Sequence, residues 1–342
     1  MNVNRRSFLT GSAMALLAPR PGFAATVQDG AGRAVTVPGK VERVFPAGPP
    51  AAILLYTLAP DLLLGWPRAN RVPELEFLLP EVGRRPEVGR LTGRGNTANL
   101  EVVLALKPDL ILDSGSVTET YVSLAERVQG QTGISYALLN GRFDHIPQSY
   151  RTLGRLVVRE REGEALAAFA EETMKAVTGR TLKVPEAKRL RVYYARGPRG
   201  LETGLGGSIN VETIEFIGAH NVAGGQRGGL ANVSIEQVLV WDPEVIVTID
   251  QDFARDVRSD PRWASVSAVK AGRVHLSPKL PFGWVDFPPS VNRLIGLWWL
   301  GKILYPELFP EDLRERTRDF YSRFYHVTLS DEQIGRVLAG RD

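Results

Sequence analysis

The pattern of apolar and polar positions repeats itself along this chain of 342 residues. Residues 99–112 and residues 234–247 each begin with a helix-capping residue, continue with apolar residues at helical spacing and then reach a proline. An unbroken aliphatic run follows each proline, which is the pattern of a strand buried on both faces of a parallel sheet. The two copies start 135 residues apart (234 minus 99). A helix–strand unit that recurs at this distance predicts two similar α/β lobes.

Each copy carries its own signals for where its helix begins and ends. The side chains of Asn99 and Ser234 are suited to accept hydrogen bonds from the free N–H groups of a first helical turn. Pro108 and Pro243 end the helices, because proline lacks an N–H and restricts the residue before it. Between these limits the apolar spacing predicts one buried face per helix, formed by Leu100, Val103 and Leu104 in the first copy and Ile235, Val238 and Leu239 in the second.

Similar patterns predict the other elements. In the first lobe we expect a hairpin at 27–37, strands at 44–47, 62–66 and 134–139, and a helix at 51–58. In the second lobe we expect strands at 190–195 and 274–276 and helices at 208–217, 291–305 and 312–325. Residues 146–182 are helical in pattern, which predicts a rigid connector. The predicted organisation is a signal peptide at 1–24, an N-terminal α/β lobe at 25–145, a helical connector at 146–184 and a C-terminal α/β lobe at 185–342.

The first 24 residues predict export rather than structure. The segment contains Arg5-Arg6 in a setting that resembles the twin-arginine export motif, and small residues before Ala25 suit a signal peptidase. An ordinary secretory leader with two chance arginines is the alternative. Since the chain has no cysteine, disulfides and thiolate metal sites are excluded, and we expect no lipid anchor at a cleavage-site cysteine.

The net charge of the chain gives no sign of a nucleic-acid partner. The formal charge is +4, and three arginines of the leader (Arg5, Arg6 and Arg20) account for most of it, which leaves +1 (4 minus 3) on the remainder. No basic run or stripe is present.

These features together resemble the periplasmic binding proteins of ABC importers for iron chelates, haem and cobalamin, the helical-backbone or class III group. The motif Asn-Leu-Glu-x-x-x-x-Leu-x-Pro-Asp-Leu-Ile at 99–111, its Ser-Ile-Glu partner at 234–246 and the segment Gly-Leu-Trp-Trp-Leu-Gly-x-x-Leu-Tyr-Pro at 296–306 carry the resemblance. The resemblance implies an α/β fold with two Rossmann-like lobes, one long connecting helix, and a ligand cleft between lobes that move little. It also implies that Glu101 and Glu236 form ion pairs with arginines of an ABC permease dimer in the inner membrane. We expect a soluble periplasmic monomer.

The loops that follow strands predict where a ligand binds, because ligands of open α/β sheets sit beyond the carboxyl ends of the strands. The candidate contacts selected in this way are Pro49, Arg94, Arg142, Arg196, Arg199, Trp284 and Phe287. The set is rich in arginine and aromatic residues and has few carboxylates, so an anionic chelate or an oxyanion is the expected guest. The alternatives are that some of these arginines are solvated loop residues and that Trp284 packs the lobes.

Direct metal ligation, cofactors and catalysis are not expected. The four histidines are scattered without metal-ligand spacing. The glycine cluster at 204–207 lacks the full pattern of a phosphate-binding loop, although a helix starting at Ser208 would suit an oxyanion.

The sequence therefore predicts a binding protein that captures a metal chelate, with a ferric siderophore favoured, and delivers it to a permease. Molybdate or tungstate, haem and cobalamin are the alternatives within this class. An exported two-lobed enzyme such as a metal chelatase is the alternative from another class. Glu101 and Glu236 have their own alternative, in which each only stabilises the positive end of a helix dipole.

Overall fold

The first lobe is built on a three-stranded parallel sheet. The computed structural model describes residues 25–93 and 98–340, so the predicted signal peptide and Arg94 lie outside it. The sheet has the order β3-β4-β5, with β3 (Val44–Pro46), β4 (Leu110–Gly115) and β5 (Ser135–Asn140). The other elements of this lobe are β1 (Ala25–Gln28), β2 (Ala34–Val37), α1 (Pro49–Leu58), α2 (Val72–Leu75), α3 (Pro80–Gly83), α4 (Leu100–Leu106), α5 (Glu119–Thr132) and α6 (Ile146–Leu156).

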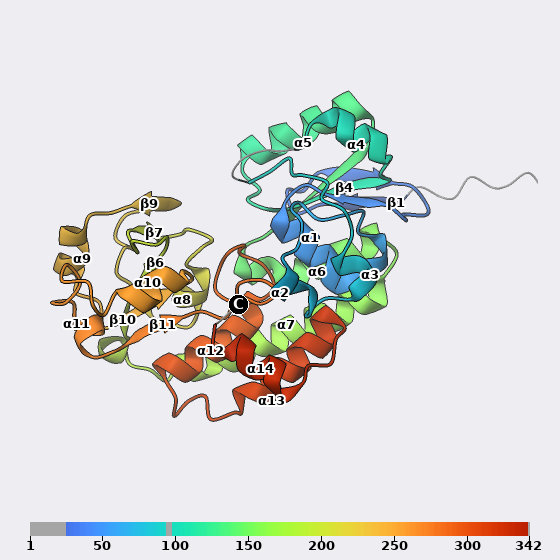
Figure 1. The fold of residues 1–342 in the computed structure, drawn as a ribbon. Helices are drawn as coiled ribbons and strands as arrows, with labels where there is room; N and C mark the ends of the chain where they lie inside the picture. The colour runs from blue at the N-terminus through green and yellow to red at the C-terminus, as the bar shows by residue number, and fades with distance from the viewer. Residues whose placement is uncertain (1–24, 94–97, 341–342) are drawn as a thin grey trace, which may run out of the picture.

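The second lobe repeats the plan with a four-stranded parallel sheet. Its order is β11-β10-β6-β8, with β6 (Arg191–Ala195), β8 (His220–Asn221), β10 (Val245–Thr248) and β11 (Val274–Leu276). Around it lie β7 (Glu202–Gly204), β9 (Leu230–Asn232), α8 (Glu212–Phe216), α9 (Ile235–Trp241), α10 (Gln251–Asp256) and α11 (Ser267–Lys270). Figure 1 shows the two lobes side by side, with the second at the left. The predicted α/β fold with two lobes is confirmed.

One long helix, α7 (Glu160–Thr181), passes beneath both lobes (Figure 1). The prediction of unbroken helix over 146–182 is wrong, because α6 ends at Leu156 and Val158 adopts a left-handed φ of 54°. Helices α6 and α7 then pack against each other. A Cβ on Gly163 would lie 2.8 Å from the Tyr150 carbonyl oxygen, so this approach requires glycine.

The C-terminal helices return from the second lobe to the first. They are α12 (Arg293–Leu304), α13 (Leu313–Phe320), a π-helical turn at Tyr321–Tyr325 and α14 (Asp331–Leu338). The hydroxyl of Tyr56 on α1 donates to the Tyr325 carbonyl oxygen at 2.9 Å, and Arg336 pairs with Glu76 at 2.7 Å. One apolar core therefore contains residues of α1, α7, α12 and the chain terminus.

The repeated helices form as predicted, but their buried face is narrower than expected. Asn99 accepts from Val102 N at 2.9 Å and Ser234 accepts from Gln237 N at 3.2 Å. Leu104 and Leu239, predicted to be buried, are 44% and 38% exposed. Each helix has only seven residues and buries only its central valine, Val103 or Val238, so Leu104 and Leu239 stay at the surface.

Two other local predictions need correction. Residues 62–66 do not form a strand but end a 3-10 turn (Pro60–Leu62) and make single bridges, Val44 to Leu63 and Trp66 to Glu87. The helix expected at 208–217 is shorter, since α8 begins at Glu212. Within residues 25–93 and 98–340, none of the helices has the length and apolar content needed to cross a lipid bilayer.

Candidate functional site

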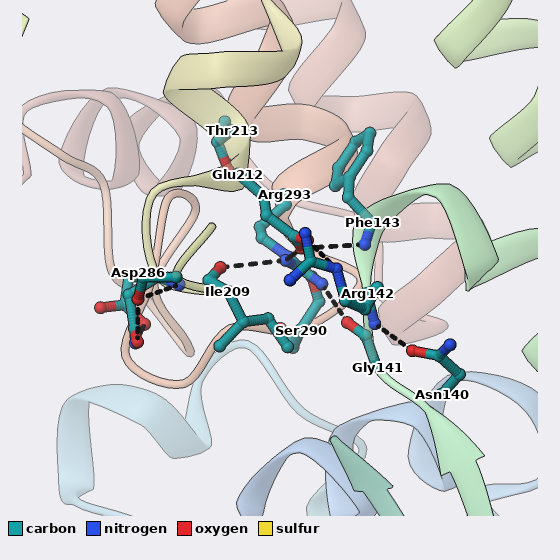
Figure 2. Close-up of polar contacts among 12 residues, drawn as sticks. Asn140, Gly141, Arg142, Phe143, Ile209, Glu212, Thr213, Asp286, Ser290 and Arg293 are labelled. Atoms are coloured by element: carbon teal, nitrogen blue, oxygen red, sulfur yellow. Dashed lines mark hydrogen bonds and ion pairs between the residues drawn. The ribbon is translucent and has the colours of Figure 1, made fainter. Parts of the chain in front are cut away.

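The loop after β5 carries Arg142 to the junction between the lobes. The Arg142 Nε atom lies 2.7 Å from Glu212 Oε1, and its Nη1 donates to the Gly207 carbonyl oxygen at 2.9 Å. Both partners belong to the second lobe, so Arg142 bridges the lobes (Figure 2). Its side chain is still 45% exposed, which leaves it open to solvent.

Glu212 is shared by a second arginine, which is buried. Arg293 at the start of α12 places Nη1 2.7 Å from Glu212 Oε2 and donates from Nη2 to the Gly141 carbonyl oxygen at 2.7 Å. The Phe143 N–H also donates to Glu212 Oε2, at 2.9 Å. Burial lowers the pKa of Arg293 and the Glu212 charge opposes that shift, so the guanidinium stays protonated. Two guanidinium groups share one carboxylate, and this group therefore carries a net positive charge.

A second polar network, formed by residues of the second lobe, lies next to the network around Glu212. Arg196 places Nη1 3.2 Å from Asp286 Oδ2 and Nε 3.4 Å from Glu202 Oε2, in ion pairs without hydrogen-bond geometry. Asp286 is fully buried and accepts from the Tyr194 hydroxyl at 2.8 Å and from Asn210 Nδ2 at 2.9 Å. Burial and the Asp286 charge raise the pKa of Tyr194.

Adjacent backbone positions connect these two networks. The carbonyl oxygen of Ile209 accepts from Arg293 Nη1 at 3.3 Å (Figure 2). The next residue, Asn210, donates from Nδ2 to Asp286. Polar contacts therefore run without a break from the end of β5 to the loop at 278–292.

A small cavity lies beside Arg293, where several predicted ligand loops meet. It holds about 20 Å³, which is room for about one water molecule. Its wall combines the start of α1, the ends of β4 and β5, the start of α6 and residues 289–293: Pro50, Leu54, Ser114, Asn140, Gly141, Ile146, Ser149, Pro289, Ser290, Val291 and Arg293. The carboxyl ends of β4 and β5 therefore face residues 289–293, which come from the second lobe.

The predicted ligand contacts fall into different environments. Pro49 opens α1 beside the cavity-lining Pro50, and Arg199 is exposed on the loop after β6. Phe287 is 64% exposed and has a left-handed φ of 69°, which is unusual for a residue with a side chain. Trp284 is buried, with its indole N–H 3.4 Å from the Tyr321 hydroxyl oxygen. Its environment is that of a packing residue, which agrees with the alternative interpretation that Trp284 packs the lobes.

Carboxylates lie beside the predicted arginines, although the loops selected from the sequence contain few of them. Arg142 and Arg196, both predicted from sequence, are each paired with acidic residues that were not predicted: Glu212, Glu202 and Asp286. Arg293 was missed as well, although an arginine inside the apolar run 291–300 indicates a buried charge with a partner.

Ser208 does not start a helix. Its hydroxyl group is buried and lies 3.1 Å from Asn210 Oδ1. The preceding Gly207 gives its carbonyl oxygen to Arg142. The glycine cluster therefore positions Arg142 rather than offering helix N–H groups to an oxyanion.

Glu101 and Glu236 are exposed in the first turns of α4 and α9, at the outer edges of the two lobes (Figure 1). The pKa of Glu236 is lowered by a hydrogen bond from its own backbone N–H and by another from Ser234. Glu236 therefore also contributes to the cap of its helix.

Comparison with known proteins gives consistent matches. The periplasmic binding protein family matches residues 81–280. The molybdate-binding protein MolA of Haemophilus influenzae is 28% identical over 279 residues, 76% of this chain and 78% of that protein. The structure of MolA bound to molybdate shares the fold, with a TM-score of 0.75 at 24% identity over 90% of this chain and 99% of that one.

A solute-binding protein of an ABC transporter from Sulfurospirillum deleyianum is also similar. It has a TM-score of 0.83 and 29% identity over 91% of this chain and 98% of that one. Members of the matched family are substrate-binding transport proteins rather than enzymes, and the family match spans more than half of this chain. The chain therefore belongs to the periplasmic binding protein family, as the substrate-binding component of an ABC importer.

Proposed function

We propose that this protein captures a small oxyanion of the molybdate and tungstate class at the junction between its lobes. The observation that carries the proposal is the half-exposed guanidinium of Arg142, in a group where two arginines share the single carboxylate of Glu212. Hydroxyl and amide groups of Ser114, Asn140 and Ser290 line the adjacent cavity. Arginine N–H groups and neutral donors of this kind bind oxyanions. The similarity to a molybdate-binding protein supports the same class of ligand.

A second ligand class, an anionic ferric siderophore, is favoured by one observation. Phe287 exposes its ring on the loop at 278–292, and an inorganic oxyanion makes no use of an aromatic surface. An organic chelate gains from burying such a ring. The sequence favoured this class, and a Fe(3+)-citrate-binding protein of Bacillus subtilis is 23% identical over 54% of this chain.

Calorimetric titration with molybdate, tungstate, sulfate, ferric citrate, a ferric hydroxamate and cobalamin distinguishes these proposals. We expect molybdate and tungstate to bind. Arg142→Ala should weaken them by about 1.5–3 kcal/mol, the range for hydrogen bonds to charged groups, because its half-exposed guanidinium is the proposed donor to the ligand. Phe287→Ser should weaken only an organic chelate. Binding of cobalamin alone would refute an anionic ligand, and binding of the chelates alone would favour the second class.

We also propose that the loaded protein is a periplasmic monomer, exported by the twin-arginine route, that docks on a two-subunit permease through Glu101 and Glu236. Both carboxylates are exposed, and one lies on each lobe. Charge reversal of both residues should abolish docking to vesicles that contain the permease and leave ligand affinity unchanged. Full transport by Glu101→Arg/Glu236→Arg would contradict the docking role and leave both residues with only a stabilising role at the start of their helices.

A further inference from the structure

Helices α4 and α9 present the same surface to solvent. At each of their seven positions the degree of burial is the same in both helices, except that Val102 is more exposed than Gln237. Leu104 and Leu239 are both exposed, although each belongs to an otherwise apolar run. In a helix, residues three positions apart lie on one face, so Leu104 shares a face with Glu101 and Leu239 with Glu236.

The C-terminal ends of both helices are held in the same way. Arg43 donates to the carbonyl oxygens of Leu106 and Lys107 at 2.7 and 3.3 Å. Arg191 donates to the carbonyl oxygens of Trp241 and Asp242 at 2.8 and 2.7 Å. Each arginine stands at or just before the first strand of its lobe's sheet.

The connections that follow the helices also correspond. Lys107 and Asp242 both have left-handed φ angles, 47° and 38°. The next acidic residues, Asp109 and Glu244, accept from the backbone N–H groups of Arg43 and Arg191 at 2.9 Å each. Since side chains hold both ends of each short helix, the exposed leucines sit on fixed rather than fraying turns.

We propose that Leu104 and Leu239 form the apolar half of the docking surface and that each contacts an apolar side chain beside a permease arginine. This inference rests on the docking proposed for Glu101 and Glu236. Ion pairs between exposed side chains contribute little on their own. An apolar contact one turn away adds buried area and keeps water from the ion pair.

The partner is a protein with two equivalent surfaces rather than a lipid surface. The same carboxylate and leucine occur once on each lobe, so two like sites on the partner satisfy both. An anionic lipid surface would repel the exposed Glu101 and Glu236.

The test compares docking of Leu104→Gln/Leu239→Gln with that of wild type and of Leu182→Gln. Glutamine matches leucine in size and helix propensity, which protects the fold. Leu182 is a matched control, since it is an exposed leucine at the end of the connector α7. Binding is measured on vesicles that contain the permease and on liposomes of the same lipids without it, with and without molybdate.

We expect the double variant to dock about tenfold more weakly than wild type, because that is the scale of losing two partly buried apolar contacts. Its melting temperature and ligand titration should match wild type, and Leu182→Gln should dock normally. Wild-type docking by the double variant would overturn the inference, as would equal binding of wild type to the lipid-only liposomes. The reversal Glu101→Arg/Glu236→Arg separates the two proposals. If reversal abolishes docking and the leucine changes do not, only the role of the leucines fails. If neither has an effect, the docking surface itself lies elsewhere.

Discussion

Replacing Glu212 by glutamine is expected to destabilise the junction between the lobes. Within residues 25–93 and 98–340, Glu212 is the only carboxylate that forms an ion pair with Arg293, and that arginine is buried. The substitution keeps the size of the side chain but removes the charge. It also turns an amide NH₂ either toward Arg142 Nε, which faces Oε1, or toward Arg293 Nη1 and the Phe143 N–H, which both face Oε2.

The size of the stability loss follows from the charge of Arg293, which stays buried after the substitution. Removing one partner of a buried ion pair costs about 3–5 kcal/mol, because the other charge remains buried without compensation. Arg142 adds little to this loss, since solvent reaches it. With a urea dependence of roughly 3 kcal/mol per molar for a chain of this size, the unfolding midpoint should fall by roughly 1–1.7 M.

Urea unfolding, followed by circular dichroism and tryptophan fluorescence, measures this change. Glu164→Gln is the matched control, because Glu164 pairs with Arg151 in an exposed ion pair on the connector. The double variant Glu212→Gln/Arg293→Gln should recover part of the loss, since no uncompensated buried charge remains. A Glu212→Gln midpoint equal to that of Glu164→Gln would refute the reasoning. A double variant no more stable than the single one would show that the buried charge is not the cause.

Two further predictions concern packing and pH. Gly296→Ala in α12 should destabilise by about 1–3 kcal/mol, since the new Cβ would lie 2.1 Å from the Trp284 carbonyl oxygen. Gly335→Ala in α14 meets no neighbour closer than 3.9 Å and should instead stabilise by about 0.5–1 kcal/mol in thermal melts. Burial lowers the pKa of both His275 and His326, so the unfolded chain binds their protons more tightly. Their contribution to stability should be complete above about pH 6.5 and be lost as pH falls through the folded pKa, and the double glutamine variant should flatten this pH dependence of the urea midpoint.

The repeated units could be predicted from sequence because their signals are local. All the signals of the first unit lie within fourteen residues (99–112): a capping residue, a short apolar run, a proline and an aliphatic run. The strands β4 and β10 and the helices before them therefore form where the pattern places them. The break between α6 and α7 was missed because Val158 carries no breaker signal. It depends on the tertiary approach of Gly163 to Tyr150.

The candidate site could be predicted only in part, for a similar reason. Strand ends identified the loops that carry Arg142 and Phe287, but they gave no information on which charges meet there. Glu212 lies in α8 and Arg293 in α12, far apart in sequence, so only the folded chain brings them to Arg142. Burial of an apolar residue follows from periodicity only when the helix is long enough, and Leu104 on a seven-residue helix is not covered.

The junction network also links ligand capture to docking. Glu101 and Glu236 lie on different lobes, so the relative position of the lobes determines the separation of the two carboxylates. Contacts of Arg142 and Arg293 with Glu212, and the shared core of α1 with the C-terminal helices, fix that position. A buried ion pair gives little stability compared with an apolar substitute, but breaking it is costly, because one charge then stays buried without compensation. A ligand that binds Arg142 therefore acts on a group that also sets the spacing of the proposed docking residues, although it touches neither of them.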